Sequence, residues 1–240
     1  MENKKGIFAA SGLLLATALF STQPVVAAST LTFTGFEYGS VDVNFGTSLP
    51  LPPAVVTHAN AGALNASING GPSFEAFCVD VWQTFSFNHN YSLGAASNYT
   101  YRPSMLGYVT NAGALTQGTL DNLSRLYTEA HSSIIGNATN SAAFQLALWE
   151  IAYETPGNYN LTSGNFHSTG PAGVTSVANG WLLNLANFAP SYSISGYVSE
   201  NYQDVIVFHG VPEPETYAML LAGLGLMGFV ARRRRGSTAV

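Results

Sequence analysis

Positively charged side chains are scarce in this sequence and lie almost entirely at its two ends. Both lysines, Lys4 and Lys5, are near the N-terminus, and residues 29–210 contain two arginines, Arg102 and Arg125, against ten acidic residues. With histidine neutral, this central part carries eight net negative charges. Because phosphate binding needs clustered lysine and arginine, we expect no nucleic acid as a partner.

Cysteine is nearly absent as well, since Cys78 is the only one in 240 residues. A disulfide within the chain is therefore excluded. The thiol must be buried and inert, bridged to another molecule, reactive, or capped in some other way. Free cysteine is among the most buried residue types, which favours the first of these.

The first 28 residues have the three parts of a secretory signal peptide. Lys4 and Lys5 form a basic start, residues 7–20 form an apolar stretch, and residues 23–28 end in the small side chains that precede a cleavage site. We therefore predict a signal helix within residues 1–28. It would direct the chain to the Sec translocon and be removed by cleavage after Ala28.

The C-terminal segment combines a short motif, an apolar run and a basic cluster. The motif is Val211-Pro212-Glu213-Pro214 and the apolar run covers residues 217–231. The cluster consists of four adjacent arginines: Arg232, Arg233, Arg234 and Arg235. Arginines in this position stay on the cytoplasmic side of a membrane, and the run is shorter than the roughly 20 residues that a stable transmembrane helix prefers. A temporary membrane anchor fits both features.

This order of parts resembles the PEP-CTERM sorting signal, here over residues 211–236. The resemblance implies an inner-membrane-anchored intermediate, held transiently by a C-terminal transmembrane helix and cleaved near Pro-Glu-Pro by an exosortase-type protease. It also implies a Gram-negative bacterium that makes an extracellular polysaccharide, and a final place on the cell surface or in the biofilm matrix. The alternative is an ordinary C-terminal tail anchor.

Residues 29–210 are predicted to form one exported body with an α+β fold. Alternating or apolar runs predict strands over residues 30–34, 41–45, 74–82, 192–195, 197–198 and 205–208. Helical spacing predicts one helix after Thr119, a second over 142–153 and a third over 177–188. Because strands flank a run of helices, we expect an antiparallel β sandwich or barrel-like sheet flanking a helical middle.

Three local expectations follow from the same patterns. The strand over residues 74–82 has apolar side chains on both faces, which is typical of a central, buried strand. Thr119 is the expected cap of the first helix, and Asn140 or Ser141 that of the second. Residues 60–72, rich in Gly, Ala and Asn, are expected to form a loop.

Gln145 is a polar residue in a strongly apolar helix. It lies one position off the expected core stripe, with Trp149 one turn later on the same face. A polar group near burial needs a partner. The lone thiol of Cys78 is a chemical partner, because attack of its thiolate on the Gln145 carboxamide, with loss of ammonia, would give an internal thioester.

The segments around these two residues resemble the paired motifs of thioester domains, known chiefly from Gram-positive surface adhesins. Phe77-Cys78-Val79-Asp80 matches an aromatic-Cys-aliphatic strand, and residues 144–149 (FQLALW) match a helix with Gln, Ala and Trp at the same spacing, although Phe144 replaces the usual Thr. The resemblance implies an amide link between Gln145 and an amine-bearing surface or matrix component. It also implies that Trp149 shields the bond and that Asp80 or Glu150 accepts a proton, solvation being the simpler role for Glu150.

Other functions remain open at this point. Aromatic and Asn-rich loops over residues 87–91 and 98–102 could stack on sugar rings, which would make the protein a carbohydrate-binding or structural matrix component. A Cys-His hydrolase would pair Cys78 with His89, His131 or His167, but no peptidase signature surrounds the cysteine. The five histidines show no metal-ligand spacing. We therefore expect no metal, no cofactor and no enzyme beyond autocatalytic thioester formation.

The signal peptide gives a first testable prediction. N-terminal sequencing of the exported protein should begin at Ser29, within two residues, because the small side chains before it suit signal peptidase. An exported protein that retains Met1 would contradict the assignment of residues 1–28.

Overall fold

The structure is a computed structural model of the chain, and it describes residues 29–48, 58–94, 97–110, 113–154, 157–211 and 219–228. The predicted signal peptide, the Pro-Glu-Pro motif and the arginine cluster lie outside these ranges. Residues 219–228 of the apolar run form a helix. None of the helices in the described ranges is long and apolar enough to cross a membrane. The transmembrane helix and the signal helix therefore stay predictions.

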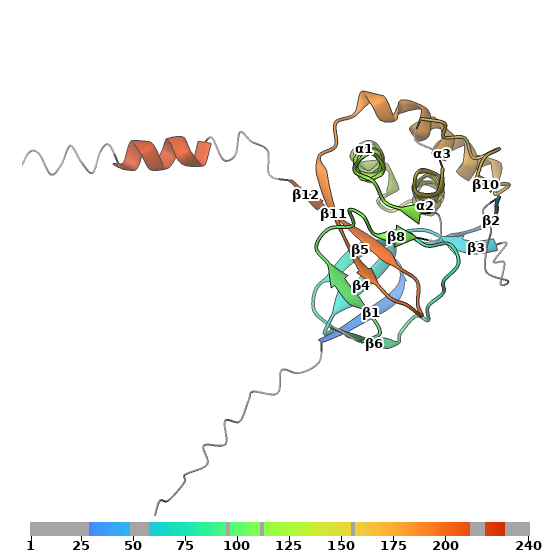
Figure 1. The fold of residues 1–240 in the computed structure, drawn as a ribbon, viewed down its shortest axis with the longest axis horizontal. Coiled ribbons are helices and arrows are strands. Elements are labelled where there is room, and N and C mark those ends of the chain that lie inside the picture. Colours follow the sequence, from blue (N-terminus) through green and yellow to red (C-terminus); the bar gives the residue numbers. More distant parts are fainter. Residues whose placement is uncertain are drawn as a thin grey trace, which may run out of the picture.

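Seven antiparallel strands form the largest sheet, which curls until its two edges almost meet (Figure 1). In spatial order the strands are β6 (Asn90–Leu93), β1 (Ser29–Phe36), β4 (Leu64–Ile68), β5 (Ser73–Cys78), β12 (Val205–Gly210), β11 (Tyr192–Val198) and β7 (Thr100–Arg102). The edges approach at a bridge between Leu93 and Tyr99. There the Gly94 N–H donates to the Tyr99 carbonyl at 2.9 Å. The sheet is thus nearly closed.

Aromatic rings fill the interior of this curled sheet. The ring centroid of Phe33 lies 6.1 Å from that of Tyr91 and 5.9 Å from that of Tyr99. Leu31, Leu64 and similar apolar side chains complete this cluster. The Tyr99 hydroxyl donates to the Gln203 carbonyl at 2.8 Å, so its polar end is satisfied although the ring is fully buried.

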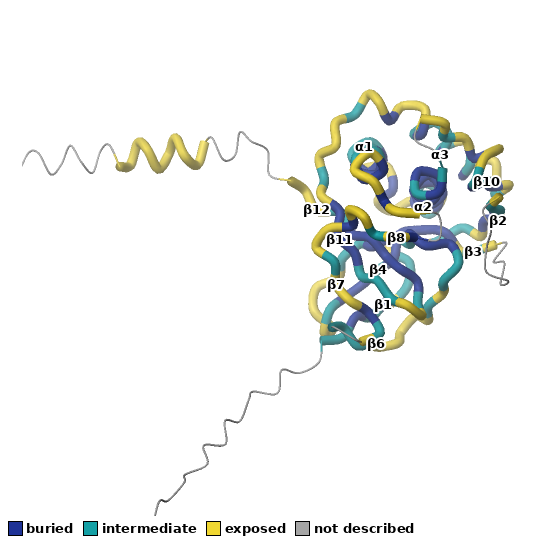
Figure 2. Tube along the Cα trace, viewed as in Figure 1, coloured by how far each residue is buried: buried dark blue, intermediate teal, exposed yellow. Residues whose placement is uncertain are grey.

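Three helices pack in a layer beside the sheet, and the second of them lies between the other two (Figures 1 and 2). They are α1 (Gln117–Ile134), α2 (Ala138–Tyr153) and α3 (Ala172–Asn184), which continues into a 3-10 turn, η1 (Leu185–Asn187). α2 contacts both α1 and α3 and also the neighbouring strands. Twelve of its sixteen residues are therefore buried. A polar side chain on this helix must find its partner within the protein.

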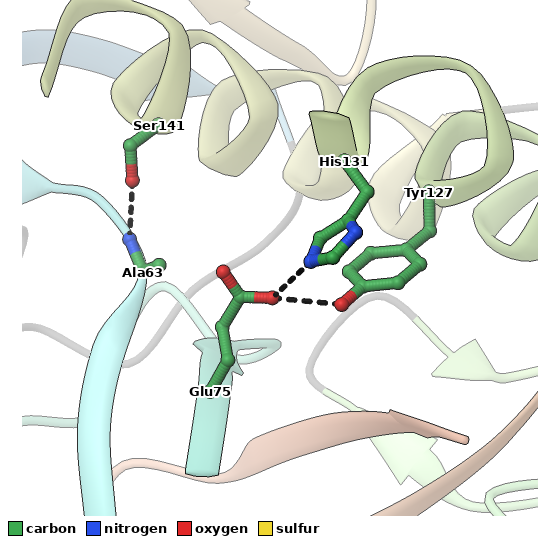
Figure 3. A network of polar contacts seen from close by, with 5 residues as sticks. All are labelled: Ala63, Glu75, Tyr127, His131 and Ser141. Carbon is green, nitrogen blue, oxygen red and sulfur yellow. Dashed lines mark hydrogen bonds and ion pairs between the residues drawn. The ribbon is translucent and has the colours of Figure 1, made fainter. Parts of the chain in front are cut away.

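Two smaller sheets complete the body. One has three strands in the order β10 (Phe166–Ser168), β2 (Val41–Thr47) and β3 (His58–Ala61), and the other joins β8 (Val109–Thr110) to β9 (Gly113–Ala114). The turn between β3 and β4 is tied to α2, because the Ala63 N–H donates to Oγ of the fully buried Ser141 at 2.8 Å (Figure 3). The first turn of α2 is thereby fixed against the sheets.

The helices begin earlier than predicted. Thr116, not Thr119, caps α1, since its hydroxyl accepts from the Thr119 N–H at 3.1 Å. Asn137 caps α2 in place of Asn140 or Ser141, accepting from the Asn140 N–H at 3.0 Å. α3 begins at residue 172 rather than 177. The added first turns contribute few buried side chains, so apolar periodicity does not reveal them.

The predicted loop over residues 60–72 is wrong. It contains the end of β3 and all of β4, whose Leu64 and Ala66 are fully buried. Alanine and asparagine are poor strand formers, but packing against the cluster inside the curled sheet overrides that preference. The expected loops over 87–91 and 98–102 likewise contain part of β6 and all of β7. The two short strands expected at 192–198 are one continuous strand, β11.

The central position of β5 is confirmed, although the strand ends at Cys78 instead of residue 82. It lies between β4 and β12. Phe77 belongs to the core that faces the helices, and Ala76 to the core inside the curled sheet. Apolar residues on both faces of this strand thus serve two separate cores.

Replacing Phe77 should test how strongly these layers depend on each other. Its buried ring contacts Phe144 of α2 at 4.5 Å between centroids and Tyr127 of α1 at 6.3 Å. Phe77→Ala should lower the free energy of unfolding by about 3–5 kcal/mol through the cavity it leaves, measured by urea denaturation. Leu183→Ala, at a position on α3 that is 81% exposed, should change it by less than about 0.5 kcal/mol. Equal effects of the two variants would contradict this packing.

Candidate functional site

Cys78 lies at the seam between the curled sheet and the helical layer. It is the last residue of β5, where it pairs with Val205 of β12. Beyond it the chain leaves the strand, although the Val79 N–H still donates to the Asp204 carbonyl at 2.9 Å. The half-buried cysteine packs against both apolar cores. At this end of β5 the backbone of Cys78 lies against α2.

The Gln145 carboxamide forms two hydrogen bonds with the backbone of Cys78. Its Nε2 donates to the Cys78 carbonyl at 2.7 Å, and its Oε1 accepts from the Cys78 N–H at 3.0 Å. Gln145 is 1% exposed, so these bonds satisfy an amide that has no access to bulk water. The structure thus brings together the two residues that the sequence singled out.

This double contact fixes where the carboxamide carbon lies. Both of its heteroatoms are bound to groups that flank one Cα atom, that of Cys78. Cδ of Gln145 therefore faces the Cα that carries the thiol side chain. The contact resembles one rung of a strand ladder, with a side-chain amide in the place of a neighbouring backbone.

A largely apolar cavity of about 360 Å³ adjoins the thiol. Cys78 and Trp149 line it together with three phenylalanine rings: Phe36, Phe85 and Phe87. Trp149 is 3% exposed and packs against Phe45, with ring centroids 5.6 Å apart. The cavity can admit a small ligand, and its lining beside Cys78 is mostly apolar.

The environment of Cys78 disfavours a charged sulfur. Burial raises the pKa of its thiol from 9.0 to about 12, and the nearby charge of Asp80 adds to the effect. At neutral pH the sulfur is therefore almost entirely in the uncharged thiol form. A Cys-His hydrolase needs the opposite, a stabilised thiolate.

Asp80 is buried in a small network that shapes the chain after β5. Its Oδ1 accepts from the Tyr153 hydroxyl at 3.2 Å and from the Trp82 N–H at 3.1 Å. The Tyr153 hydroxyl in turn accepts from the Val81 N–H at 3.1 Å. Asp80 is not among the residues that line the cavity. Its contacts position the segment beside Cys78.

Glu150 is fully buried, so the expectation that water solvates it is wrong. It follows Trp149 on α2, and its Oε1 accepts from the Asn160 N–H at 2.6 Å. Burial raises the pKa of its carboxyl to about 7. It does not line the cavity beside Cys78. Its contacts tie α2 to the loop around Asn160.

The sequence reasoning missed two residues of the cavity that Cys78 lines. His58 lines the same cavity, whereas His89, His131 and His167 do not. Its Nδ1 lies 3.5 Å from Oδ1 of Asp42. Gln203 also lines the cavity and donates through Nε2 to the Asp80 carbonyl. Both come from segments far away in sequence, and no local pattern marks them.

Within the described ranges, no three histidine, cysteine or acidic side chains are placed to hold a metal ion.

Comparison with known families assigns the C-terminal segment. Residues 210–235 match the model of the PEP-CTERM protein-sorting motif. This match implies an exported, surface-sorted protein that an exosortase processes during export. No curated protein matches the chain.

The structure is similar to thioester domains of bacterial surface proteins. The N-terminal thioester domain of the fibronectin-binding protein SfbI from Streptococcus pyogenes aligns with a TM-score of 0.45 at 16% identity, over 79% of this chain and 97% of that chain. The N-terminal domain of the Streptococcus pyogenes pilus tip adhesin Cpa aligns with a TM-score of 0.41 at 14% identity, over 79% of this chain and 97% of that chain. The N-terminal thioester domain of a surface protein from Clostridium perfringens aligns with a TM-score of 0.34 at 14% identity, over 71% of this chain and 99% of that chain.

The buried Glu150 should make stability depend on pH. Because its folded pKa of about 7 exceeds its ordinary value of 4.5, the folded state keeps a proton that the unfolded state loses between these values. The free energy of unfolding therefore falls as pH rises from 4.5 to 7. Glu150→Gln keeps the acceptor for Asn160 without the charge, and should reduce this fall by about 2–3 kcal/mol in denaturation curves.

Glu200→Gln, at an exposed position, is the matched control and should leave the pH profile as it is. If both variants followed the wild-type curve, Glu150 would not titrate in this way.

Proposed function

We propose that this is a surface protein whose body forms an internal thioester between Cys78 and Gln145 and uses it to bind an amine-bearing partner through an amide bond. The observation that supports this most is the double hydrogen bond between the Gln145 carboxamide and the Cys78 backbone. It holds the single cysteine of the chain beside an amide that is excluded from water.

In the first step the sulfur of Cys78 attacks Cδ of Gln145. A C–S bond forms, the C–Nε2 bond breaks, and nitrogen leaves as ammonia after taking up the thiol proton. The Cys78 N–H already donates to Oε1, the atom on which negative charge develops during the attack. A donor placed in advance at that oxygen stabilises the tetrahedral transition state.

Burial has opposite consequences for the two forms of the sulfur. It raises the pKa of the free thiol to about 12, which penalises the thiolate. A thioester carries no charge and escapes this penalty. The same apolar walls, with Trp149 among them, limit hydrolysis by keeping water away from the acyl carbon.

In the second step a primary amine of the partner attacks the same carbon. A C–N bond forms, the C–S bond breaks, and the proton lost by the amine restores the Cys78 thiol. The Cys78 carbonyl, which accepts from Nε2 of the unreacted amide, can accept from the N–H of the new amide. One backbone position thus serves both the entering and the departing nitrogen.

The distribution of lysine suits this chemistry. Residues 29–210 contain none, so the body has no ε-amine that could consume the thioester of its own or a neighbouring copy. Arginine is no substitute, because its guanidinium stays protonated. Apart from the α-amine at the new N-terminus, the nucleophile must then come from another molecule, such as a surface or matrix component with free amines.

Non-covalent carbohydrate binding, or a structural role in an extracellular polysaccharide matrix, is the second candidate. Exposed rings favour it, in particular Phe87 at 38% and Tyr101 at 45% exposure. In this case Cys78 would be an inert thiol and Gln145 a hydrogen-bond partner alone.

Intact mass spectrometry of the exported body should distinguish the candidates. We expect a mass one ammonia below that of the processed sequence, a Cys78 that does not react with thiol reagents, and methylamine addition at Gln145. These results follow because the thioester has lost Nε2, blocks the sulfur and activates the carbonyl. A folded protein of full mass with a titratable thiol would contradict the covalent function.

Three variants serve as controls. Cys78→Ala and Gln145→Ala should each show the full mass of their own sequence and take up no methylamine. Gln117→Ala, at an exposed position on α1, should keep both the mass deficit and the reaction. Methylamine uptake by the Cys78→Ala protein would show that another group is reactive.

A further inference from the structure

β5 and β12 are hydrogen-bonded neighbours over only part of their length. Their pairing is confined to Cys78 with Val205 and Phe77 with Ile206, although β5 begins at Ser73 and β12 continues to residue 210. The strands therefore diverge away from Cys78. A cavity of about 410 Å³ lies at this divergence and takes its walls from both strands and from α1.

Aromatic rings form most of these walls: Tyr38, Phe74, Tyr127, Tyr197 and Phe208. Tyr127 stacks on Phe208, with centroids 4.2 Å apart and planes 7° from parallel, and on His131 at 4.4 Å. A second pair of rings lines the same cavity, because the ring centroid of Phe74 lies 5.7 Å from that of Tyr197. Tyr127 is itself buried, so the half-buried rings of Phe74, Tyr197 and Phe208 supply the surface for a ligand, and such surfaces suit a ring with one apolar face.

The aromatic row continues out of the cavity along the sheet. Tyr101 of β7 is paired with Tyr197 of β11 in the sheet, and their ring centroids lie 5.2 Å apart. The Tyr101 side chain is 45% exposed. Phe74, Tyr197 and Tyr101 thus form a track that leads from the cavity to the surface. A track of this kind fits a chain of rings better than a single small molecule.

One carboxylate gives the cavity its charge. Oε2 of Glu75 accepts from the Tyr127 hydroxyl at 2.8 Å and lies 3.5 Å from Nε2 of His131 (Figure 3). Burial raises the pKa of the Glu75 carboxyl and lowers that of His131, so both groups are driven toward their uncharged forms, and a bound cation would favour the carboxylate. No lysine or arginine is among the described residues that line the cavity. An ammonium group would supply the missing positive charge.

We propose that this cavity binds a saccharide with a free amino group, its ring against Tyr197 and Phe74 and its ammonium group beside Glu75. Acidic saccharides fit poorly, because Glu75 and the eight net negative charges of residues 29–210 repel them. The site goes beyond the covalent function and does not need the thioester.

Isothermal titration of the exported body with a glucosamine oligosaccharide tests this site. We expect saturable binding that weakens roughly tenfold or more with the N-acetylated oligosaccharide, which lacks the charge. Glu75→Gln should weaken glucosamine binding similarly, and Tyr197→Ala should weaken both ligands by removing a ring face. The second variant keeps the test valid if Glu75→Gln fails to fold.

Asp121→Asn removes one negative charge from α1 at a position that does not line the cavity, and it should bind like the wild type. Cys78→Ala should also bind normally, which separates this result from the fate of the thioester. No binding of the glucosamine oligosaccharide, equal binding of its acetylated form, or equally tight binding of a galacturonate oligosaccharide would overturn the proposal.

Discussion

The double hydrogen bond between the Gln145 side chain and the Cys78 backbone is the contact on which the site depends. It joins the central helix to the central strand, and it satisfies a polar group in a helix with little access to water. An unpaired amide at this depth would destabilise the fold by about 1–3 kcal/mol. The bonding that stabilises the fold therefore also places the carboxamide carbon beside the cysteine.

Two features of the chain would protect the proposed thioester at this place. The apolar cavity wall keeps the sulfur in surroundings that disfavour charge, as the raised pKa of Cys78 indicates. The exported part has no lysine, so it carries no ε-amine that could react with the proposed thioester. Export fits the same scheme, because the sorting motif at residues 210–235 implies an exported, surface-sorted protein, and the proposed partner would be met outside the cell.

The sequence predicts the outline of the fold and the central pair of the site. Apolar residues on both faces of β5 and the apolar run of α2 are strong local signals, and they carry Cys78 and Gln145. β4 was missed because its strand conformation comes from packing rather than from composition. The burial of Glu150 and the place of His58 in the cavity depend on distant segments, which no local pattern reveals.

The central claim concerns a single bond, and a crystal structure of the exported body at high resolution tests it most directly. We expect continuous electron density between Sγ of Cys78 and Cδ of Gln145, with sulfur in place of Nε2 as the third substituent of Cδ and with Oε1 still accepting from the Cys78 N–H. Separate side chains, with an intact Gln145 amide donating to the Cys78 carbonyl, would contradict the claim.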